Sequence, residues 1–258
     1  QWSRGLGDVY KRQNEVNEFI LTSYNEDADY VQDNIYGTCI EDNTFYVSVD
    51  GNDSNIGSES EPFLTINKAF GRVKTTGETT IVRVLEGYYS PSTTGEKFPV
   101  TIPDNVHLIG DTPENTILDA EGTFFNQRGV IRIESSENVM VTNFTITGGY
   151  DQDNGCHAGG GISLIVPDND PMGDVEISDA IFENLIIEDN FGYVGGGINI
   201  YKVQGPTFQN IEVRNNKSAY MGGGVFLQKG IATFKQMLIS QNENGVSAAP
   251  GRQGGGMM

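Results

Sequence analysis

The chain is short of positive charge and of good helix-forming residues. It has 16 Lys and Arg against 35 Asp and Glu, which gives a net charge of −19. This balance argues against nucleic acid as a partner, because phosphates are bound by a clustered basic surface. Leu (10) and Ala (9) are few, while Gly (33) and Asn (23) are abundant. Since glycine destabilises helices, the composition favours many short strands separated by turns over a helical protein.

Cysteine, histidine and long apolar runs are nearly absent as well. Cys39 and Cys156 are the only cysteines, so no disulfide framework is expected, and two thiols so far apart in sequence are more often free than paired. His107 and His157 are the only histidines, which gives a zinc centre or a Cys–His catalytic pair little support. No apolar run reaches the roughly 18 residues of a membrane span.

The two ends of the sequence differ from the rest. Residues 1–13 have no periodicity and resemble translated adaptor read-through, so we set them aside from fold reasoning; the alternative is a genuine N-terminal segment without fixed structure. Residues 14–43 are polar and acidic, and we expect a linker or a loosely packed lead-in. Residues 44–258 are expected to form one domain, and the sequence is expected to be a fragment because its last residues fall inside a repeat.

Residues 44–147 predict short strands and one helix. Phe45–Val49 alternates as a strand does. The spacing of apolar residues predicts a helix near residues 65–74, with Thr65 as its N-cap. Further strands are expected at residues 80–85, 100–102, 106–109, 116–119, 130–133, 139–141 and 144–147. None of these is followed by a helix, which disfavours an alternating α/β parallel sheet.

A repeat dominates the second half. Three segments align without gaps and recur every 26 residues: Phe182–Asn190, Phe208–Asn216 and Phe234–Asn242. Three consecutive glycines follow each copy, at Gly195–Gly197, Gly222–Gly224 and Gly254–Gly256, and the triplet Gly159–Gly161 follows a weaker earlier copy. A period of this length indicates a solenoid, a propeller or an array.

One period holds about three short strands, too little for a propeller blade of about 40 residues. Three short strands a turn describe a parallel β-helix, in which equivalent residues lie about 4.8 Å apart on successive coils. We therefore expect an internal stack of Phe182, Phe208 and Phe234. The repeated asparagines are expected at a tight turn, with side-chain amides bonding from coil to coil, and the glycines at close corners.

The chain also resembles a known family. The repeat half is similar to the right-handed parallel β-helix proteins of the pectate-lyase-like superfold. Tyr46–Gly57 and Pro62–Ile66 look like the opening segment of many such proteins. The resemblance implies a helix that caps the first coil, and a secreted or cell-surface protein. It does not imply one activity, because the family includes polysaccharide lyases, other carbohydrate-active enzymes, adhesins and surface proteins.

Loops of variable length between each asparagine and its glycine triplet are the expected binding face, since insertions in a solenoid cluster on one side. Aromatic faces stack on sugars, and polar neighbours bond sugar hydroxyls. The candidate carbohydrate-binding residues are Tyr150, His157, Phe191, Tyr193, Tyr201 and Tyr220. The alternative is that the aromatic residues shield the corner of the β-helix.

Two acidic loops are candidate Ca²⁺ sites, because Ca²⁺ prefers oxygen ligands. Asp151 and Asp153 begin a D-x-D-x-G pattern that lacks the terminal Glu of an EF-hand, and Asp168 and Asp170 lie in a second oxygen-rich turn. The alternative is that all four are ordinary turn residues.

A lyase on this fold would need a basic residue beside its substrate and bound calcium. Lys202 and Lys229 are the available bases, with Arg214 on another strand, although two exposed lysines one coil apart also describe a solvated edge. The strand after each glycine triplet is expected to point Ser163, Ile165, Asn199, Tyr201, Phe226 and Gln228 outward. No catalytic pattern matches, so no catalytic residue is assigned.

Two functions remain. The first is an extracellular or cell-surface β-helix, expected to be a monomer, that presents a binding face for a polysaccharide or surface glycan without catalysis. The second is a polysaccharide lyase or glycoside hydrolase. The acidic balance of residues 143–258, with 6 Lys and Arg against 12 Asp and Glu, disfavours a polyuronate substrate and favours the first.

Overall fold

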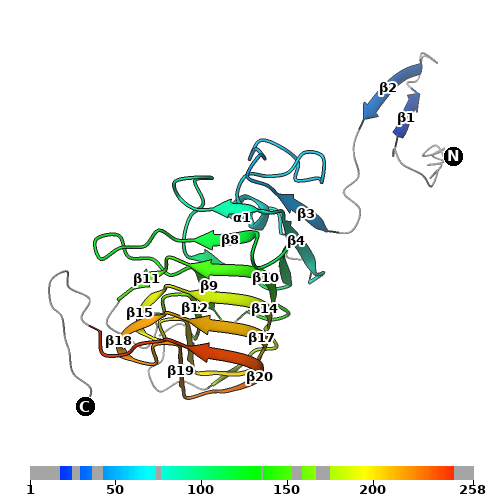
Figure 1. Cartoon of the computed structure of the whole chain (residues 1–258). Coiled ribbons are helices and arrows are strands. Elements are labelled where there is room, and N and C mark those ends of the chain that lie inside the picture. The colour runs from blue at the N-terminus through cyan, green and yellow to red at the C-terminus, as the bar shows by residue number, and fades with distance from the viewer. Residues whose placement is uncertain are drawn as a thin grey trace. The chain divides into compact units, whose positions relative to one another are not determined.

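The computed structural model describes residues 43–73, 77–134, 136–152, 159–166 and 175–246, together with two earlier strands (Figure 1). Its contacts divide the chain into residues 1–42 and residues 43–258. In the first unit, β1 (Glu18–Tyr24) and β2 (Tyr30–Tyr36) pair antiparallel. The segment expected to be a linker thus contains a two-stranded sheet.

The second unit is built almost entirely of short strands. They are β3 (Thr44–Val47), β4 (Thr80–Val84), β5 (Gly87–Tyr89), β6 (Val100–Thr101), β7 (Val106–Gly110), β8 (Thr116–Asp119), β9 (Ile131–Glu134), β10 (Met140–Thr147), β11 (Tyr150–Asp151), β12 (Ile162–Ile165), β13 (Glu176–Ile177), β14 (Ile181–Glu188), β15 (Phe191–Val194), β16 (Ile198–Tyr201), β17 (Val203–Arg214), β18 (Lys217–Met221), β19 (Val225–Gln228) and β20 (Ile231–Ser240).

Pairing among these strands is parallel throughout, and each strand pairs with its equivalent on the next coil. One sheet runs from β3 through β4, β7, β10, β14 and β17 to β20, with β5 and β8 beside it. A second sheet has the order β19-β16-β12-β9-β6, and a third the order β11-β15-β18. Sheets that grow by one strand a turn form a parallel β-helix, so the predicted fold class is confirmed (Figure 1).

The predicted stack of Phe182, Phe208 and Phe234 is confirmed, although its last ring, that of Phe234 on β20, is 40% exposed. Phe182 pairs with Phe208, and Phe208 with Phe234, in parallel register. Their ring centroids lie 4.6 Å and 5.3 Å apart. Phe182 and Phe208 are fully buried. The spacing matches the separation of neighbouring strands, because equivalent side chains point the same way on successive coils.

The asparagine column also forms as predicted, at the turn between the first and third sheets. The Nδ2 atom of Asn190 donates to Oδ1 of Asn216 at 3.0 Å, and Nδ2 of Asn216 donates to Oδ1 of Asn242 at 3.1 Å. Each Nδ2 also reaches a backbone carbonyl of the preceding coil, such as that of Ile187 for Asn216. At the start of the column Gly149 donates its backbone N–H to Oδ1 of Asn190.

The helix α1 (Ile66–Phe70) caps the first coils, shorter than the predicted segment. Oγ1 of Thr65 accepts from the N–H of Lys68, as the N-cap prediction requires. The buried Glu96 completes the cap in a way that the sequence did not suggest. Its carboxylate accepts the backbone N–H groups of Ile66 at 2.6 Å and Asn67 at 3.2 Å. These groups lack partners within the helix itself.

One expectation about exposure is wrong. Along β12 and β16, the side chains expected to point to solvent are buried: Ser163 at 4%, Ile165 at 3%, Asn199 at 0% and Tyr201 at 8% exposure. The first glycine of a triplet packs closely against Ser163 and Asn199. A side chain on Gly159 would come within 2.5 Å of Oγ of Ser163 and 2.6 Å of Cβ of Asn199.

Lys202 is likewise not part of a solvated edge, as only 2% of its surface is exposed and its Nζ lies 5.5 Å from the centre of the Tyr201 ring. Lys229, one coil later, is exposed as expected.

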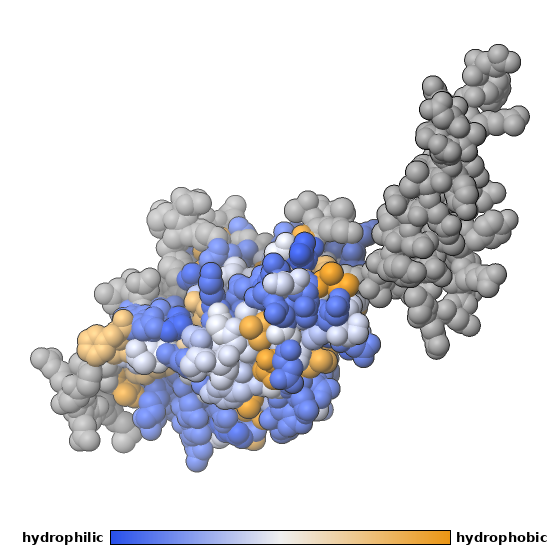
Figure 2. Space-filling model, turned by 90° about the horizontal axis from the view of Figure 1, so that it is seen from above, coloured by the Kyte–Doolittle hydropathy of each residue, from blue (hydrophilic) through white to orange (hydrophobic). Residues whose placement is uncertain are grey.

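The surface of the described part is mostly hydrophilic in the view from above, with scattered hydrophobic side chains (Figure 2). Within the described ranges, we find no helix with the length and apolarity of a membrane span.

Candidate functional site

The third sheet carries most of the aromatic residues that the sequence analysis assigns to the loops before the glycine triplets. It follows the asparagine turn on each coil and forms one edge of the β-helix (Figure 1). Along β15, Gly192 and Val194 are buried, while Phe191 and Tyr193 are half-buried. Tyr150 pairs with Phe191 across the strands. We call Tyr150, Phe191, Tyr193 and Tyr220 the aromatic flank.

The rings of the aromatic flank form two stacks. Tyr150 and Phe191 have centroids 4.8 Å apart and planes that differ by 13°. Tyr193 and Tyr220 have centroids 5.9 Å apart and planes that differ by 20°. A bulge in the pairing of β15 with β18 brings Tyr220 opposite Tyr193. The structure therefore brings together four of the six predicted sugar-binding residues.

This stacking limits how the rings can meet a ligand. Tyr150 and Phe191 belong to adjacent coils, so the line between their centres runs along the axis of the β-helix. Each ring therefore turns one face to its neighbour. A sugar that stacks on an aromatic ring needs an uncovered face, so each stack can offer at most its two outer faces. Tyr220, which is 58% exposed, has the most accessible ring of the four.

The other predicted site residues do not join the aromatic flank. Tyr201 lies on β16, in the second sheet, and is buried. Asp151 is half-buried on β11. Among the predicted ligands, His157, Asp153, Asp168 and Asp170 lie outside the described residues. Over the described ranges, we find no group of three His, Cys, Asp or Glu side chains that could hold a metal ion.

A neighbouring hairpin was missed by sequence reasoning. Residues 121–128, between β8 and β9, form a loop that we call the Phe hairpin. Thr123 and Asn126 pair through both backbone N–H groups at 3.0 Å, which leaves Phe124 and Phe125 at the tip. Phe125 is 88% exposed and Phe124 is 37% exposed. Their rings meet edge to face, with centroids 5.2 Å apart.

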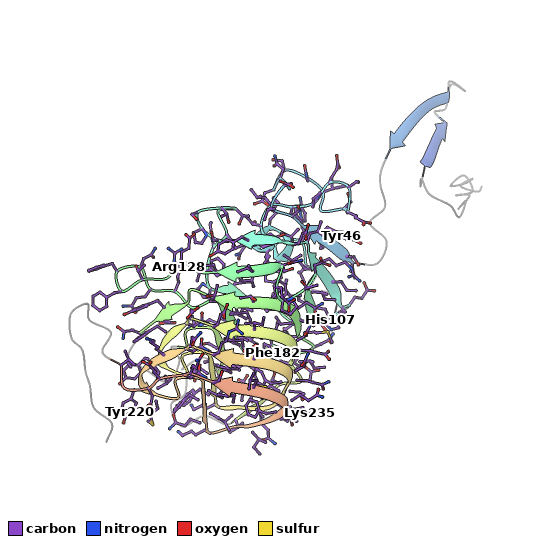
Figure 3. All side chains as sticks on the ribbon, viewed as in Figure 1. Tyr46, His107, Arg128, Phe182, Tyr220 and Lys235 are labelled. Carbon is purple, nitrogen blue, oxygen red and sulfur yellow. The ribbon has the colours of Figure 1, made fainter. Side chains whose placement is uncertain are left out.

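The base of the Phe hairpin is tied to the aromatic flank. Arg128 and Tyr150 exchange two backbone hydrogen bonds of 2.6 Å and 2.8 Å. The backbone N–H of Gly122 donates to the carbonyl of Gly148 at 2.7 Å. Arg128 and Tyr220 lie on the same edge of the molecule, opposite the edge that carries His107 and Lys235 (Figure 3).

A polar cluster lies beside the hairpin on the preceding coil. The hydroxyl of Tyr88 donates to the carboxylate of Asp119. Burial, and then this hydrogen bond, raise the pKa of Tyr88 to about 12. The hydroxyls of Ser92 and Ser90 both donate to Glu121. The Ser92 hydrogen bond is the main cause that lowers the pKa of Glu121, so this exposed carboxylate stays charged at neutral pH.

Arg214, a possible lyase base, is held in an ion-pair cluster. Its Nε lies 2.6 Å from Glu188 and one terminal nitrogen lies 2.7 Å from Glu212. The two carboxylates raise the pKa of Arg214 further above its ordinary value. A guanidinium that is paired twice and firmly protonated is unsuited to take a proton.

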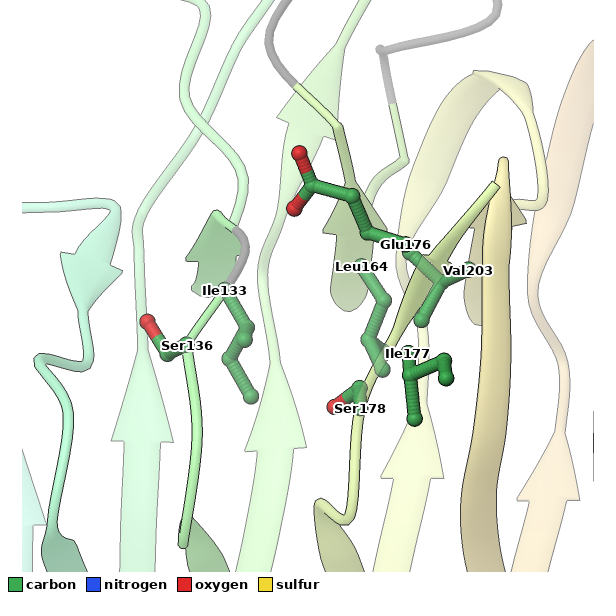
Figure 4. Close-up of a pocket in the computed structure, with 7 residues that line it drawn as sticks. All are labelled: Ile133, Ser136, Leu164, Glu176, Ile177, Ser178 and Val203. Atoms are coloured by element: carbon green, nitrogen blue, oxygen red, sulfur yellow. The ribbon is translucent and has the colours of Figure 1, made fainter. Parts of the chain in front are cut away.

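One small pocket opens elsewhere, and its lining is mainly apolar (Figure 4). Its wall includes Ile133, Leu164 and Ile177, and the carboxylate of Glu176 points away from them. The hydroxyl of Ser136, at its margin, already donates to the carbonyl of Ile102 at 3.0 Å. This pocket therefore offers little polar chemistry to a ligand.

Several solved structures are similar to this chain at low identity. They include the pectin methylesterase PemA from Erwinia chrysanthemi (17% identity, TM-score 0.47, covering 79% of this chain and 56% of that one). A pectin methylesterase from carrot has 15% identity and a TM-score of 0.39, with 77% and 65% covered. A rhamnogalacturonan lyase has 14% identity and a TM-score of 0.42, with 81% and 64% covered.

The chain spans just over half the length of the first of these structures. A comparison with curated protein sequences gives no significant match. A family model described as a protein of unknown function, DUF1565, matches residues 49–253. Because this match covers most of the chain, the protein belongs to the DUF1565 family.

Proposed function

We propose that this β-helix binds a glycan along the edge formed by the aromatic flank and the Phe hairpin, and that it does so outside the cell or at its surface. The observation that carries the proposal is the run of partly exposed aromatic residues on successive coils, from Phe125 through Tyr150 to Tyr220. Carboxylates and amides lie between and beside them. Sugars are bound by this combination of apolar ring faces and hydroxyl-bonding groups.

The charge of this edge favours a neutral glycan over a polyuronate. Asp119 and Glu121 lie at the start of the hairpin and Asp151 follows Tyr150, while the cations of this edge are Arg128 and Lys217, and Lys217 is paired with Glu243 at 3.6 Å. A polyuronate carries a carboxylate on each sugar and would be repelled by a chain with a net charge of −19, most strongly at low salt. A neutral glycan meets no such barrier.

A glycan array tests this proposal, followed by calorimetry on any glycan that binds. We expect the double variant Tyr193→Ala, Tyr220→Ala to bind at least about tenfold more weakly, which corresponds to about 1.4 kcal/mol. Lys235→Ala, on the opposite edge, is the control. Binding that survives the loss of both tyrosines would remove the aromatic flank from the site.

The polar cluster favours a second candidate, a glycoside hydrolase. Asp119 and Glu121 are two carboxylates in one turn, and Oδ1 of Asp119 accepts the backbone N–H of Glu121 at 2.7 Å. Hydrolases of glycosides use a pair of carboxyl groups as acid and as base or nucleophile. Release of reducing ends from neutral polysaccharides, lost in both Asp119→Asn and Glu121→Gln, would support this candidate.

A polyuronate lyase is the weaker enzymatic alternative, because Lys202 is buried and Arg214 is paired. Formation of unsaturated product from pectate or alginate, lost in Lys229→Ala, would favour the lyase and overturn the preference for a neutral glycan.

A further inference from the structure

The two phenylalanines at the tip of the Phe hairpin conflict with the ordinary chemistry of a turn. Gly, Asn, Asp, Pro and Ser dominate such positions because they adopt turn geometry at little cost. Phe124 and Phe125 give no such advantage, and Phe125 exposes 88% of its surface to water. Residues that do not suit their local structure are expected at positions that serve function.

Hydrogen bonds fix the backbone of the hairpin that carries this ring. Its tip is closed by the paired N–H groups of Thr123 and Asn126, and Oγ1 of Thr123 accepts the N–H of Asn126 as well. The side-chain Oε1 of Gln127 accepts the backbone N–H of Gln152 at 3.0 Å, which adds a link to the chain after β11. A ligand that meets Phe125 therefore costs little in ordering the loop.

The Phe hairpin also exposes more ring surface than the aromatic flank does. In the flank, the rings face one another, so each stack has only its outer faces left. Phe124 touches Phe125 in an edge-to-face contact, with an angle of 90° between the planes. An edge-to-face contact occupies at most one face of one ring. Phe125 thus combines the greatest exposure among the large apolar side chains of the described residues with an accessible ring face.

We propose that Phe125 is the primary anchor of the glycan site and stacks on the apolar C–H face of a neutral pyranose sugar. The inference rests on the proposed glycan-binding function and names the sugar face and the residue that receives it. Glu121 and Arg128, at the two ends of the hairpin, are the charged residues of the hairpin that could bond hydroxyl groups of the same glycan.

A sugar fits this surface better than a protein does. Stable protein interfaces bury about 800 Å² on each partner around a core depleted of charged residues. Here the apolar feature is one pair of rings, and polar or charged residues border it on both sides: Glu121, Thr123, Asn126, Gln127 and Arg128. A single ring with polar neighbours matches a single sugar.

The test compares three substitutions at one position, using the full chain and the glycan that binds the unaltered protein best on the array. Phe125→Ala and Phe125→Leu should each raise the Kd at least about tenfold, because leucine is apolar but has no ring face. Phe125→Tyr should stay within about twofold of the unaltered protein. Ile231→Ala, which changes a side chain of β20 that is 62% exposed, is the matched control and should leave the Kd unchanged.

Three other outcomes count against the inference, and they differ from one another. Phe125→Leu binding as well as Phe125→Tyr would indicate general apolar contact, as with a protein partner. Unchanged binding in Phe125→Ala, together with loss in the tyrosine double variant, would move the anchor to the aromatic flank and leave glycan binding standing. Failure of the unaltered protein to bind any glycan would remove the proposed function itself.

Discussion

The side-chain amide of Asn216 makes hydrogen bonds that link three successive coils. Its Nδ2 donates to the carbonyl of Ile187 and to Oδ1 of Asn242, and its Oδ1 accepts from both nitrogens of Asn190. All these groups are buried or half-buried, and an unsatisfied buried polar group costs about 1–3 kcal/mol. We expect Asn216→Ala to lower the free energy of unfolding by at least about 2 kcal/mol.

Asn210→Ala is the control for that measurement by denaturant titration. Asn210 also bonds to an asparagine one coil away, Asn184, but it is exposed, so water can replace its partner. Its cost should stay near the 1–2 kcal/mol of a left-handed backbone without glycine or asparagine, since its φ is 53°. Equal effects at both positions would mean that burial of the column adds nothing to what an exposed asparagine pair contributes.

Truncation of a single side chain, that of Phe208, tests the packing of the core. Its ring lies between those of Phe182 and Phe234, and no part of it is exposed. Phe208→Ala should therefore cost about 3–5 kcal/mol, as truncation of a core aromatic does. The exposed Lys229→Ala should change stability by less than about 0.5 kcal/mol. Small and similar effects would show that the phase of the repeat is wrong.

At the scale of elements, the cap helix depends on a carboxylate from a distant part of the chain. Burial raises the pKa of Glu96 above its ordinary value of 4.5, even though four N–H groups donate to it and act in the opposite direction. The folded chain therefore binds this proton more tightly than the unfolded chain does. Stability from this group is present at low pH and is lost as the pH rises through the raised pKa.

Glu96→Gln removes this titration. We expect the Tm of the unaltered protein, minus that of Glu96→Gln, to decrease as the pH rises from about 4 to about 8. A difference that grows with pH would contradict the sign, since it would mean that the N–H donors outweigh burial and depress the pKa.

Local alternation was enough to predict short strands in the first half, and the period of the second half also gave the register between coils. The strands that carry Phe182, Phe208 and Phe234 were predictable because the same residues return every 26 positions. The Phe hairpin was not, because it occurs once and its tip lacks turn-forming residues. The signal that was available is the pair Phe124–Phe125 between two polar stretches, which no core pattern explains.

The burial of Tyr201 and Lys202 could not be predicted from the residue pattern of their own strand. Alternation gives the face of a strand to which a side chain points, but it does not reveal whether that face is buried. Among the predicted sugar-binding residues, the four that meet in the aromatic flank all lie between the position of the repeated asparagine and the glycine triplet of their coil. Tyr201 has another place, on the strand after the glycine triplet.

At the scale of the whole molecule, calcium binding would appear as a gain in stability, because a ligand that binds only the folded chain stabilises it. The sequence prediction assigns Asp151 and Asp153 to one such site. We expect millimolar Ca²⁺ to raise the Tm and Mg²⁺ to raise it less, with Asp153→Asn removing most of the gain. Calorimetry that shows no heat with Ca²⁺, together with an unchanged Tm, would retire the calcium site.

The regular spacing of the aromatic stack has a consequence for how such a protein can change its length. Because the spacing from Phe182 to Phe208 equals that from Phe208 to Phe234, removal of residues 190–215 would join Asp189 to Asn216 and leave the core residues from Phe182 to Ile187 opposite their equivalents on β20. Phe182 would then face Phe234. Each repeat of 26 residues adds one coil, so a gene could lose or gain one repeat and still encode a protein with the same fold.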